Sequence, residues 1–367
     1  MTAVLRRIGR VLTRNVDGAL LVMVLALMSV GLIVLASASS ASTARLTAQF
    51  VNMLVALGVL WIAANIPPHF LMRLAFPLYV AGVLLLVAVA SYGEVAHGAR
   101  RWLDVGVTRI QPSELMKIAV PLALAWYFNR YEATLRLGNY AIAAVLLIIP
   151  VALILRQPDL GTALLISAAG FFVLFLAGLS WRVIGGLALA ALAALPLGWT
   201  LLHDYQRQRI LTLIDPGQDP LGAGYHTIQS AIAVGSGGWF GKGWMRGTQT
   251  HLDFIPERTT DFIFAVYAEE FGLIGSLVLL ALFLLVIARG LLITANAPTL
   301  FTRLLAGAVT LTFFTYTFVN MGMVSGILPV VGVPLPLISY GGTSLVTICL
   351  GMGILMSIHS HKKLVQT

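Results

Sequence analysis

The sequence predicts an all-α integral membrane protein with about ten transmembrane helices. It has 367 residues, of which 59% are hydrophobic and only 10% are charged, and its mean hydropathy is +0.93. Soluble domains average about 45–50% apolar and about 25% charged residues. One water-soluble core could not hide this much apolar surface, so the chain is expected to use a lipid bilayer as its solvent.

Apolar runs of about 17–25 residues, the length that crosses the hydrocarbon core, define the expected spans. Pro67 and Pro68 separate the second run from the third, because a helix interior does not tolerate them. We expect residues 1–367 to form a single polytopic membrane domain. The expected spans are 17–38, 47–66, 70–91, 113–129, 139–155, 159–180, 182–203, 262–289, 301–325 and 337–358.

Basic residues set the expected orientation, since Lys and Arg favour the cytoplasmic side of short loops. With the N-terminus inside, twelve fall on the inner side and five in the short outer loops, which predicts both termini in the cytoplasm and an even number of spans. The inner set is Arg6, Arg7, Arg10, Arg14, Arg73, Arg130, Arg136, Arg182, Arg289, Arg303, Lys362 and Lys363. The outer set is Arg45, Arg100, Arg101, Arg109 and Arg156.

Two outer loops stand out, roughly 92–112 and 204–261. The second, between the seventh and eighth spans, is far longer than a usual connection, and such loops are commonly functional. It contains Trp239 and Trp244, so we expect it to be ordered against the bundle. Only the acids Asp17 and Glu132 fall on the inner side, which predicts a polar site on the outer face.

Composition also limits the function classes. A net charge of +9 in a membrane protein reflects anchoring charges and anionic lipid headgroups, and no basic run alternates with aromatics as in a nucleic-acid interface. The lone Cys349 excludes an intramolecular disulfide and a cysteine-based metal site. The outer histidines lack metal-ligand spacing, so no metal site is predicted.

The Gly-rich segment 235–243 resembles a phosphate-cradling loop but fails the Walker pattern. Five residues, rather than four, separate Gly235 from Gly241, and Gly243 stands where Ser or Thr is required. We expect a tight backbone turn there. Backbone contact with a pyrophosphate lipid is the weaker alternative.

Asp261 lies where the long outer loop enters the eighth span, and an acid at a membrane boundary is a functional-site hypothesis. Glu114 and Lys117 share one helix face at the start of the fourth span. They form either a self-neutralising pair or a charged pair in which Lys117 orients a carboxylate from another helix. Asp159 either caps the sixth span or adds charge to the same cavity.

Two further features lie near the outer edge. The neighbouring Glu269 and Glu270 lie two turns inside the eighth span and cannot share a face; protonation, or hydrogen bonding to backbone within the bundle, is the simpler reading. Segment 332–344 breaks the ninth span from the tenth with two prolines and three glycines. Irregular backbone at membrane depth survives when buried in protein or lining a wet cavity, so this segment is expected to wall the outer site.

Five segments, taken in order along nearly the whole chain, resemble the SEDS family, the shape, elongation, division and sporulation proteins of bacteria. They are Gly98-Ala-Arg-Arg-Trp-Leu, Gln111-Pro-Ser-Glu-Leu-Met-Lys117, Gln157-Pro-Asp-Leu-Gly-Thr162, Pro256-Glu-Arg-Thr-Thr-Asp-Phe-Ile-Phe264 and Pro334-Leu-Pro-Leu-Ile-Ser-Tyr-Gly-Gly-Thr-Ser344. The short N-terminus is typical of the elongation member rather than the division member.

The resemblance implies a peptidoglycan glycosyltransferase in the bacterial inner membrane, which polymerises lipid II, an undecaprenyl-pyrophosphate-linked disaccharide-peptide, at the periplasmic face. It implies a class B penicillin-binding protein transpeptidase and other elongation machinery as partners. It places the catalytic aspartate at Asp261. The family's other recurrent polar positions correspond to Arg109, Glu114, Lys117, Asp159, Glu257 and Arg258.

The chemistry fits these residue types. One ionised carboxylate within reach of the acceptor hydroxyl can act as general base, and Lys117 is expected to approach Asp261 and keep it ionised. The pyrophosphate leaving group needs positive charge rather than a general acid. A divalent cation could share that role, and no other cofactor is expected. The cationic candidates are Arg109, Lys117, Arg258, Lys242 and Arg246.

Two other functions remain open from the sequence. A lipid II flippase would have a similar bundle with intramembrane charges, although polar groups along a transport path should lie near the midplane. A non-catalytic scaffold for the transpeptidase would tolerate Asp261→Ala. Glycan synthesis from lipid II by wild type but not by a variant at Asp261 separates the enzyme from both.

Overall fold

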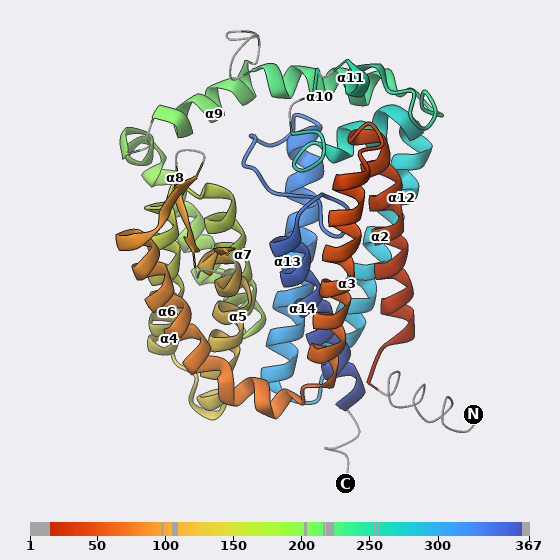
Figure 1. Cartoon of the computed structure of the whole chain (residues 1–367). Helices are drawn as coiled ribbons and strands as arrows, with labels where there is room; N and C mark the ends of the chain where they lie inside the picture. Colours follow the sequence, from red (N-terminus) through yellow and green to blue (C-terminus); the bar gives the residue numbers. More distant parts are fainter. Residues whose placement is uncertain are drawn as a thin grey trace, which may run out of the picture.

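The protein is described here from a computed structural model, which covers residues 15–96, 99–104, 109–201, 204–215, 217, 224–252, 254–255 and 257–361. Within these residues, ten long helices form a bundle (Figure 1). They are α2 (Gly18–Ala38), α3 (Thr43–Asn65), α4 (Pro68–Tyr92), α5 (Pro112–Arg130), α6 (Leu137–Leu155), α7 (Leu160–Leu176), α8 (Trp181–Leu201), α12 (Ile263–Ala295), α13 (Leu300–Val324) and α14 (Gly342–Ser360).

Each of the ten expected spans coincides with one of these helices, and the helical membrane architecture is confirmed. Seven of the described helices are long and apolar enough to cross a bilayer. The other three are α7 and the apolar part of α8, which are shorter, and α5, which carries Glu114 and Lys117 in its first turns. Ten crossings therefore remain a prediction.

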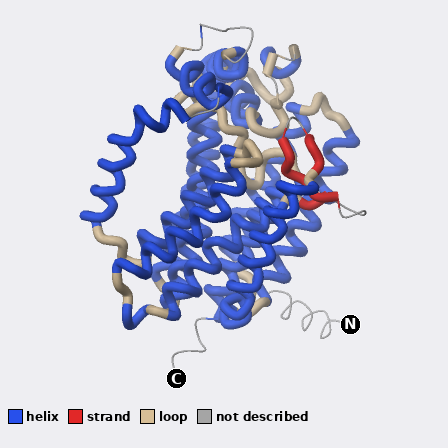
Figure 2. Tube along the Cα trace, turned by 90° about the vertical axis from the view of Figure 1, so that its left-hand side faces the viewer, coloured by secondary structure: helices blue, strands red, loops and turns tan. Residues whose placement is uncertain are grey.

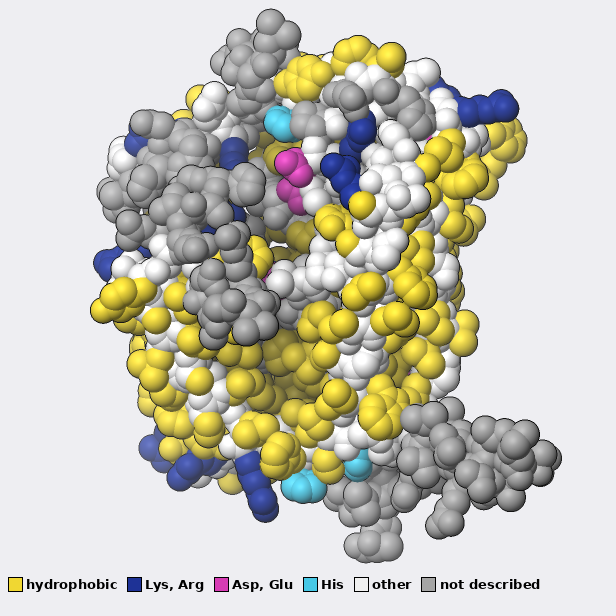
Figure 3. All heavy atoms as spheres, viewed as in Figure 1, with side chains coloured by type: hydrophobic (Ala, Val, Ile, Leu, Met, Phe, Trp, Pro, Cys, Tyr) yellow, Lys and Arg dark blue, Asp and Glu magenta, His cyan; other side chains and the backbone are white. Residues whose placement is uncertain are grey.

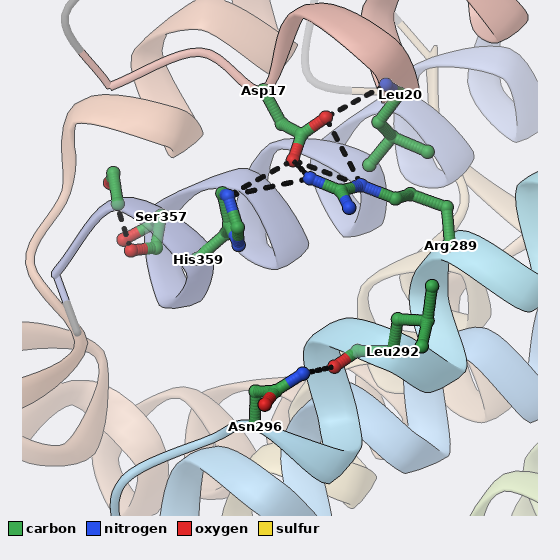
Figure 4. A network of polar contacts seen from close by, with 8 residues as sticks. Asp17, Leu20, Arg289, Leu292, Asn296, Ser357 and His359 are labelled. Atoms are coloured by element: carbon green, nitrogen blue, oxygen red, sulfur yellow. Dashed lines mark hydrogen bonds and ion pairs between the residues drawn. The ribbon is translucent and has the colours of Figure 1, made fainter.

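The described chain begins and ends at the same end of the bundle (Figure 1). Asp17 caps α2 by accepting a hydrogen bond from Leu20 N at 2.9 Å. Its carboxylate also pairs with Arg289 of α12 and, at 3.3 Å, with His359 of α14 (Figure 4). This cluster ties three helices together at one end, as an even number of crossings requires. That this end faces the cytoplasm stays a prediction.

The centre of the bundle is formed by α5, α13 and α14, whose side chains are mostly buried. At the packed face between α3 and α14, a Cβ at Gly353 would lie only 2.4 Å from the Leu60 carbonyl oxygen. The periphery is apolar and exposed, as expected of a lipid-facing surface. On α8, for example, Leu189 is 69% exposed and Leu192 is 64% exposed.

The outer loops are more regular than the sequence predicts. Residues 204–261 contain α9 (Asp204–Ile214), α10 (Tyr225–Ser236) and α11 (Thr248–His251), which lie across the end of the bundle opposite the termini (Figures 1 and 2). The expected order in this loop is therefore confirmed over its described residues. Near the inner end, η1 (Glu132–Thr134) links α5 to α6.

The 92–112 loop departs from the all-helical expectation, because it forms a small antiparallel sheet in the order β1-β2-β3. Val95 pairs with Arg100, and Leu103 pairs with Ile110. Strands this short carry no usable periodicity in the sequence. The three strands are β1 (Glu94–Ala96), β2 (Ala99–Asp104) and β3 (Arg109–Ile110).

Segment 235–243 contains a tight turn, as expected. Its backbone packs against the point at which Gly272 interrupts α12. Gly272 interrupts the helix with φ of 67°, and a Cβ there would lie 2.3 Å from Gly241 N. Four hydrogen bonds between the two segments replace the lost helical bonds. They join Lys242 N to Glu269 O (3.0 Å), Gly243 N to Glu270 O (3.0 Å), Leu273 N to Gly238 O (2.9 Å) and Ile274 N to Trp239 O (3.1 Å).

Candidate functional site

A cavity of about 350 Å³ opens at the end of the bundle opposite the termini, which is the predicted outer end, beneath α9 and α10. Space-filling atoms show a hollow there, with acidic, basic and histidine side chains around it (Figure 3). The cavity also borders the chain just before α12 and just after α13. Its lining residues are Gln208, Arg209, Thr212, Leu213, His226, Thr227, Glu257, Asp261, Phe262, Pro329, Val330 and Gly332.

Asp261 lies in a turn of residues 257–262 that leads into α12, and this turn is fixed by three contacts from elsewhere in the chain. Asn320 Nδ2 of α13 donates to the Asp261 carbonyl oxygen at 2.8 Å. Ser339 Oγ donates to Thr260 O at 2.6 Å. Tyr340 N donates to Thr259 O at 2.8 Å. The Asp261 backbone therefore has little freedom to move.

The segment after α13 walls the cavity, as the sequence predicts. Asn320 Nδ2 also donates to Val333 O at 2.7 Å, so one buried amide joins this segment to the Asp261 turn. Gly332 has φ of +73°, and a Cβ there would lie 3.4 Å from Asp261 Oδ2. Because Gly332 lacks a side chain, the carboxylate stays open to the cavity.

The surroundings of Asp261 raise the pKa of its carboxyl from 3.8 to about 6. Burial is the largest cause because it disfavours the charged form. The neighbouring charge of Glu257 raises the pKa further, whereas Arg209 of α9 lowers it. A carboxylate with such a pKa is ionised at neutral pH and more basic than an ordinary aspartate, which suits a general base.

The expected approach of Lys117 to Asp261 is wrong. Lys117, whose side chain is 5% exposed, pairs with Glu114 on its own helix, and its Nζ lies 5.2 Å from the ring centroid of Tyr316 on α13. Of the two alternatives for Glu114 and Lys117, the structure shows the self-neutralising pair. Since Tyr316 and Asn320 are four residues apart on α13, Lys117 packs one helical turn from the amide that holds the Asp261 turn.

Asp159 is a helix cap. Its Oδ1 accepts a hydrogen bond from Thr162 N at 3.2 Å at the start of α7, and Gln111 Nε2 donates to its Oδ2 at 3.4 Å. Arg101 Nε lies 4.0 Å from the same oxygen. Among the described residues that line the Asp261 cavity, Asp159 does not occur.

Two of the expected cations are bound elsewhere. Arg258 donates to the backbone oxygens of Ala38 at 2.7 Å and Thr250 at 2.6 Å, and Lys242 pairs with Glu269 at 2.7 Å. Arg109 lies on β3, and its side chain is outside the described residues. The cationic residue that lines the cavity is Arg209, which the sequence did not single out.

Glu269 is fully buried and holds the segment between α10 and α12 in place. Besides Lys242, its carboxylate accepts from Gln249 N at 3.0 Å and from Thr248 Oγ1 at 3.1 Å. Thr250 Oγ1 donates to it at 3.2 Å. Glu270 faces the other way and accepts from Ser37 of α2. The expected hydrogen bonding to backbone is confirmed for Glu269 through Gln249 N, whereas Glu270 accepts from a side chain, that of Ser37.

Glu269→Ala is expected to lower the stability by about 2–3 kcal/mol, because it removes an ion-pair partner and leaves several donors unpaired. Thermal unfolding in detergent measures this loss. Glu132→Ala, at an exposed position on η1, is the matched control and should change the stability by less than about 0.5 kcal/mol. Equal melting temperatures for both variants would show that the Glu269 contacts contribute nothing net.

Sequence reasoning missed three residues at the site. Asn320 is a fully buried amide inside an apolar helix. A polar side chain inside a membrane span is costly, as an acid is, and this argument could have identified it. Arg209 gave no local signal, because its place depends on how α9 folds across the bundle. His226 was considered only as a metal ligand.

Comparison with known proteins identifies relatives over nearly the whole chain. The family model FTSW_RODA_SPOVE, described as a cell cycle protein, matches residues 18–364. The peptidoglycan glycosyltransferase MrdB of Escherichia coli K12 is 52% identical over 351 residues, covering 95% of both chains. The peptidoglycan glycosyltransferase RodA of Treponema pallidum is 32% identical over 423 residues, covering 94% of this chain and 98% of its own.

Solved structures show the same fold. A chain of a peptidoglycan synthase complex, described as coordinating polymerization and crosslinking, superposes with a TM-score of 0.82 at 36% identity. The match covers 95% of this chain and 99% of the other. The rod shape determining protein RodA of Thermus thermophilus superposes with a TM-score of 0.71 at 33% identity, covering 94% and 96% of the two chains.

Proposed function

The chain belongs to the FtsW, RodA and SpoVE family of cell cycle proteins, and we infer that it is a peptidoglycan glycosyltransferase that polymerises lipid II. The observation that carries this proposal is the outer cavity where Asp261, its pKa raised, meets Arg209. Its likeness to MrdB and RodA supports a role in cell elongation.

In the proposed reaction, Asp261 takes the proton from the acceptor sugar hydroxyl as the oxygen attacks the anomeric carbon of the donor. The bond from that carbon to the diphosphate then breaks, and the electron pair leaves with the diphosphate. General-base catalysis of this kind typically contributes about 10²–10⁴-fold. The rigid turn around Asp261 supports this role, because a fixed base loses little entropy when the substrate arrives.

Arg209 is the proposed cation for the departing diphosphate, in place of Arg258 and Lys242. It lines the cavity and lowers the pKa of the Asp261 carboxyl. A guanidinium can bind phosphate oxygens through two parallel hydrogen bonds. Glu257 and Asp261 also offer two carboxylates to the cavity, which fits a divalent cation shared with substrate phosphates. Such a cation would add positive charge for the leaving group.

The remaining expected residues have supporting roles in this proposal. Glu114 and Lys117 stabilise the packing of α5 against α13, and Asp159 fixes the start of α7. Arg258 holds the loop that carries Asp261 against α2. A role for Arg109 in substrate binding stays a prediction from the family resemblance.

The protein is a multi-pass membrane protein, and we place it in the bacterial inner membrane with the Asp261 cavity facing the periplasm. The inner-side excess of Lys and Arg supports this orientation. A class B penicillin-binding protein is the proposed partner, together with other elongation proteins. The likeness to a chain of a peptidoglycan synthase complex supports the transpeptidase partner.

Two observations favoured the flippase alternative, the acids Glu269 and Glu270 and the broken connection between the ninth and tenth spans, and it loses the first of them. Glu269 and Glu270 were the intramembrane acids that a transport path could use. Glu269 is bound to Lys242 and the 248–250 segment, and Glu270 to Ser37. These contacts support a structural role for both.

The pH dependence of polymerisation tests the proposal. Because the base acts in its ionised form, the rate should rise with pH through an apparent pKa of about 6. Glu257→Gln removes a charge that raises the Asp261 pKa, so the acidic limb should move to lower pH. Arg209→Gln removes a charge that lowers it, so the limb should move to higher pH. The measurement is glycan-chain formation from labelled lipid II in detergent.

Glu132→Gln is the control for a distant charge and should leave the acidic limb in place. Shifts of the same sign in the Glu257 and Arg209 variants would contradict Asp261 as the titrating base. Absence of glycan chains with wild-type protein and its transpeptidase partner would contradict the proposed activity itself.

A further inference from the structure

His226 lies beside the proposed base but has no part in the reaction described so far. It is the second residue of α10 and lines the same cavity as Asp261. Its ring stacks on Phe262, the residue after Asp261, with centroids 5.7 Å apart and ring planes 22° from parallel. The stack fixes the plane of the imidazole ring.

One of those nitrogens lacks a partner. His226 Nδ1 is buried, and no described residue forms a hydrogen bond with it. A buried polar atom left unsatisfied is costly, and native proteins rarely keep one without a functional reason. A half-turn of the ring about its Cβ–Cγ bond keeps the stack on Phe262 and exchanges the positions of Nδ1 and Cδ2, so the stack does not prevent Nδ1 from turning toward a group that enters the cavity.

The charge state of the ring limits what can bind there. Burial lowers the pKa of His226, although the Glu257 carboxylate opposes that effect, so the imidazole is neutral at neutral pH. A neutral imidazole offers one donor and one acceptor. That pair suits a neutral sugar hydroxyl or amide rather than a phosphate.

We propose that His226 is a substrate-binding residue whose Nδ1 forms a hydrogen bond with a hydroxyl or acetamido group of the saccharide that enters the Asp261 cavity. The inference rests on the proposed function. It adds a contact that holds the sugar against the base. This contact comes from α10 rather than from the segments next to α12 and α13.

Three substitutions separate the contact from packing. His226→Phe keeps a ring to stack on Phe262 and removes both nitrogens. His226→Asn keeps a polar atom at the position of Nδ1, and His226→Gln keeps one near the position of Nε2. Gln229→Leu, on the same helix but not among the residues that line the cavity, is the matched control.

The experiment measures kcat and KM for glycan formation from labelled lipid II at neutral pH, with thermal unfolding of each variant. We expect His226→Phe and His226→Gln to lower kcat/KM about tenfold, the loss of one hydrogen bond. His226→Asn should restore kcat/KM to within about threefold of wild type. The melting temperature of His226→Phe, which keeps the stack, and the acidic limb set by Asp261 in all three variants should not change.

Wild-type kcat/KM in His226→Phe would overturn the proposal. So would equal losses in all three His226 variants, which would show that a polar atom at the position of Nδ1 restores nothing. Either result leaves the role of Asp261 untouched, because wild-type protein would still form glycan chains. If wild-type protein formed none, the proposed function would fail first.

Discussion

Asp261→Asn is expected to reduce glycan polymerisation by about 10²–10⁴-fold, the contribution of a general base. The amide has nearly the same shape as the carboxylate but cannot accept the proton. The backbone contacts from Asn320, Ser339 and Tyr340 to the 259–261 turn do not involve the Asp261 side chain, so the turn should stay intact. Polymer formed from labelled lipid II, per folded protein, is the measurement.

The same substitution should not destabilise the protein. The folded-state pKa of Asp261 is about 6, above its ordinary value of 3.8. A raised carboxyl pKa means that the folded state favours the protonated form, and that stability is lost as pH rises through this range. Asp261→Asn, which cannot ionise, should therefore have an equal or higher melting temperature at neutral pH.

Asp215→Asn makes the same chemical change at an exposed aspartate after α9 and should leave polymerisation near the wild-type level. Equal polymer from wild type and Asp261→Asn would remove Asp261 from its role. A lower melting temperature for Asp261→Asn would instead contradict the burial that raises its pKa.

Asn320→Leu is expected to have the second largest effect, on both stability and activity. Leucine has a similar volume, but it leaves the carbonyl oxygens of Asp261 and Val333 without their donor. Each buried unpaired group costs about 1–3 kcal/mol, so the loss should be about 2–5 kcal/mol. A displaced base loses rate steeply, and a shift of about 1 Å can cost about 10²-fold.

Thr317→Val is the matched control, one turn earlier on α13. The Thr317 hydroxyl donates only to Phe313 O of its own helix, at 3.1 Å, so its loss should change stability by less than about 1 kcal/mol. Thermal unfolding and polymer formed per folded protein check both variants. Wild-type turnover in folded Asn320→Leu would show that the amide stabilises the fold without positioning Asp261.

The fold was largely predictable because the thickness of the bilayer sets the length of the apolar run that each membrane helix needs. Each of the ten expected spans coincides with a helix within a few residues. An apolar run marks a segment that can cross the bilayer, and backbone in lipid must be helical to satisfy its polar groups. The small β1–β3 sheet was not predictable. Its strands are too short to show a periodic pattern of apolar residues, and no apolar run in the sequence marks which of them pair.

The site was predictable only in part. Asp261 was found because an acid at a membrane boundary is costly, Glu257 was found through the family resemblance, and both line the cavity. The partners of Lys117 and Arg258 were not found, because charge type does not reveal which of several buried neighbours a long side chain reaches. Lys117 contacts Glu114 and Tyr316, whereas Arg258 donates to backbone oxygens.

The spacing of residues along the sequence does not indicate that Arg209 and Asn320 lie at the site. Arg209 reaches the cavity because α9 folds back across the outer end of the bundle (Figure 1), a tertiary event with no local pattern. Asn320 joins two segments that meet because the chain after α13 returns toward the start of α12. Both residues depend on how distant segments pack rather than on any motif.

If the Asp261 carboxylate is the base in polymerisation, its titration must govern the rate. Infrared difference spectra of wild type minus Asp261→Asn, recorded across pH, isolate the carboxyl band of this side chain. We expect this band to titrate with a pKa of about 6, at the same pH as the acidic limb of the polymerisation rate. A carboxyl that titrates near 3.8, or an unchanged acidic limb in the residual activity of Asp261→Asn, would rule out Asp261 as the base.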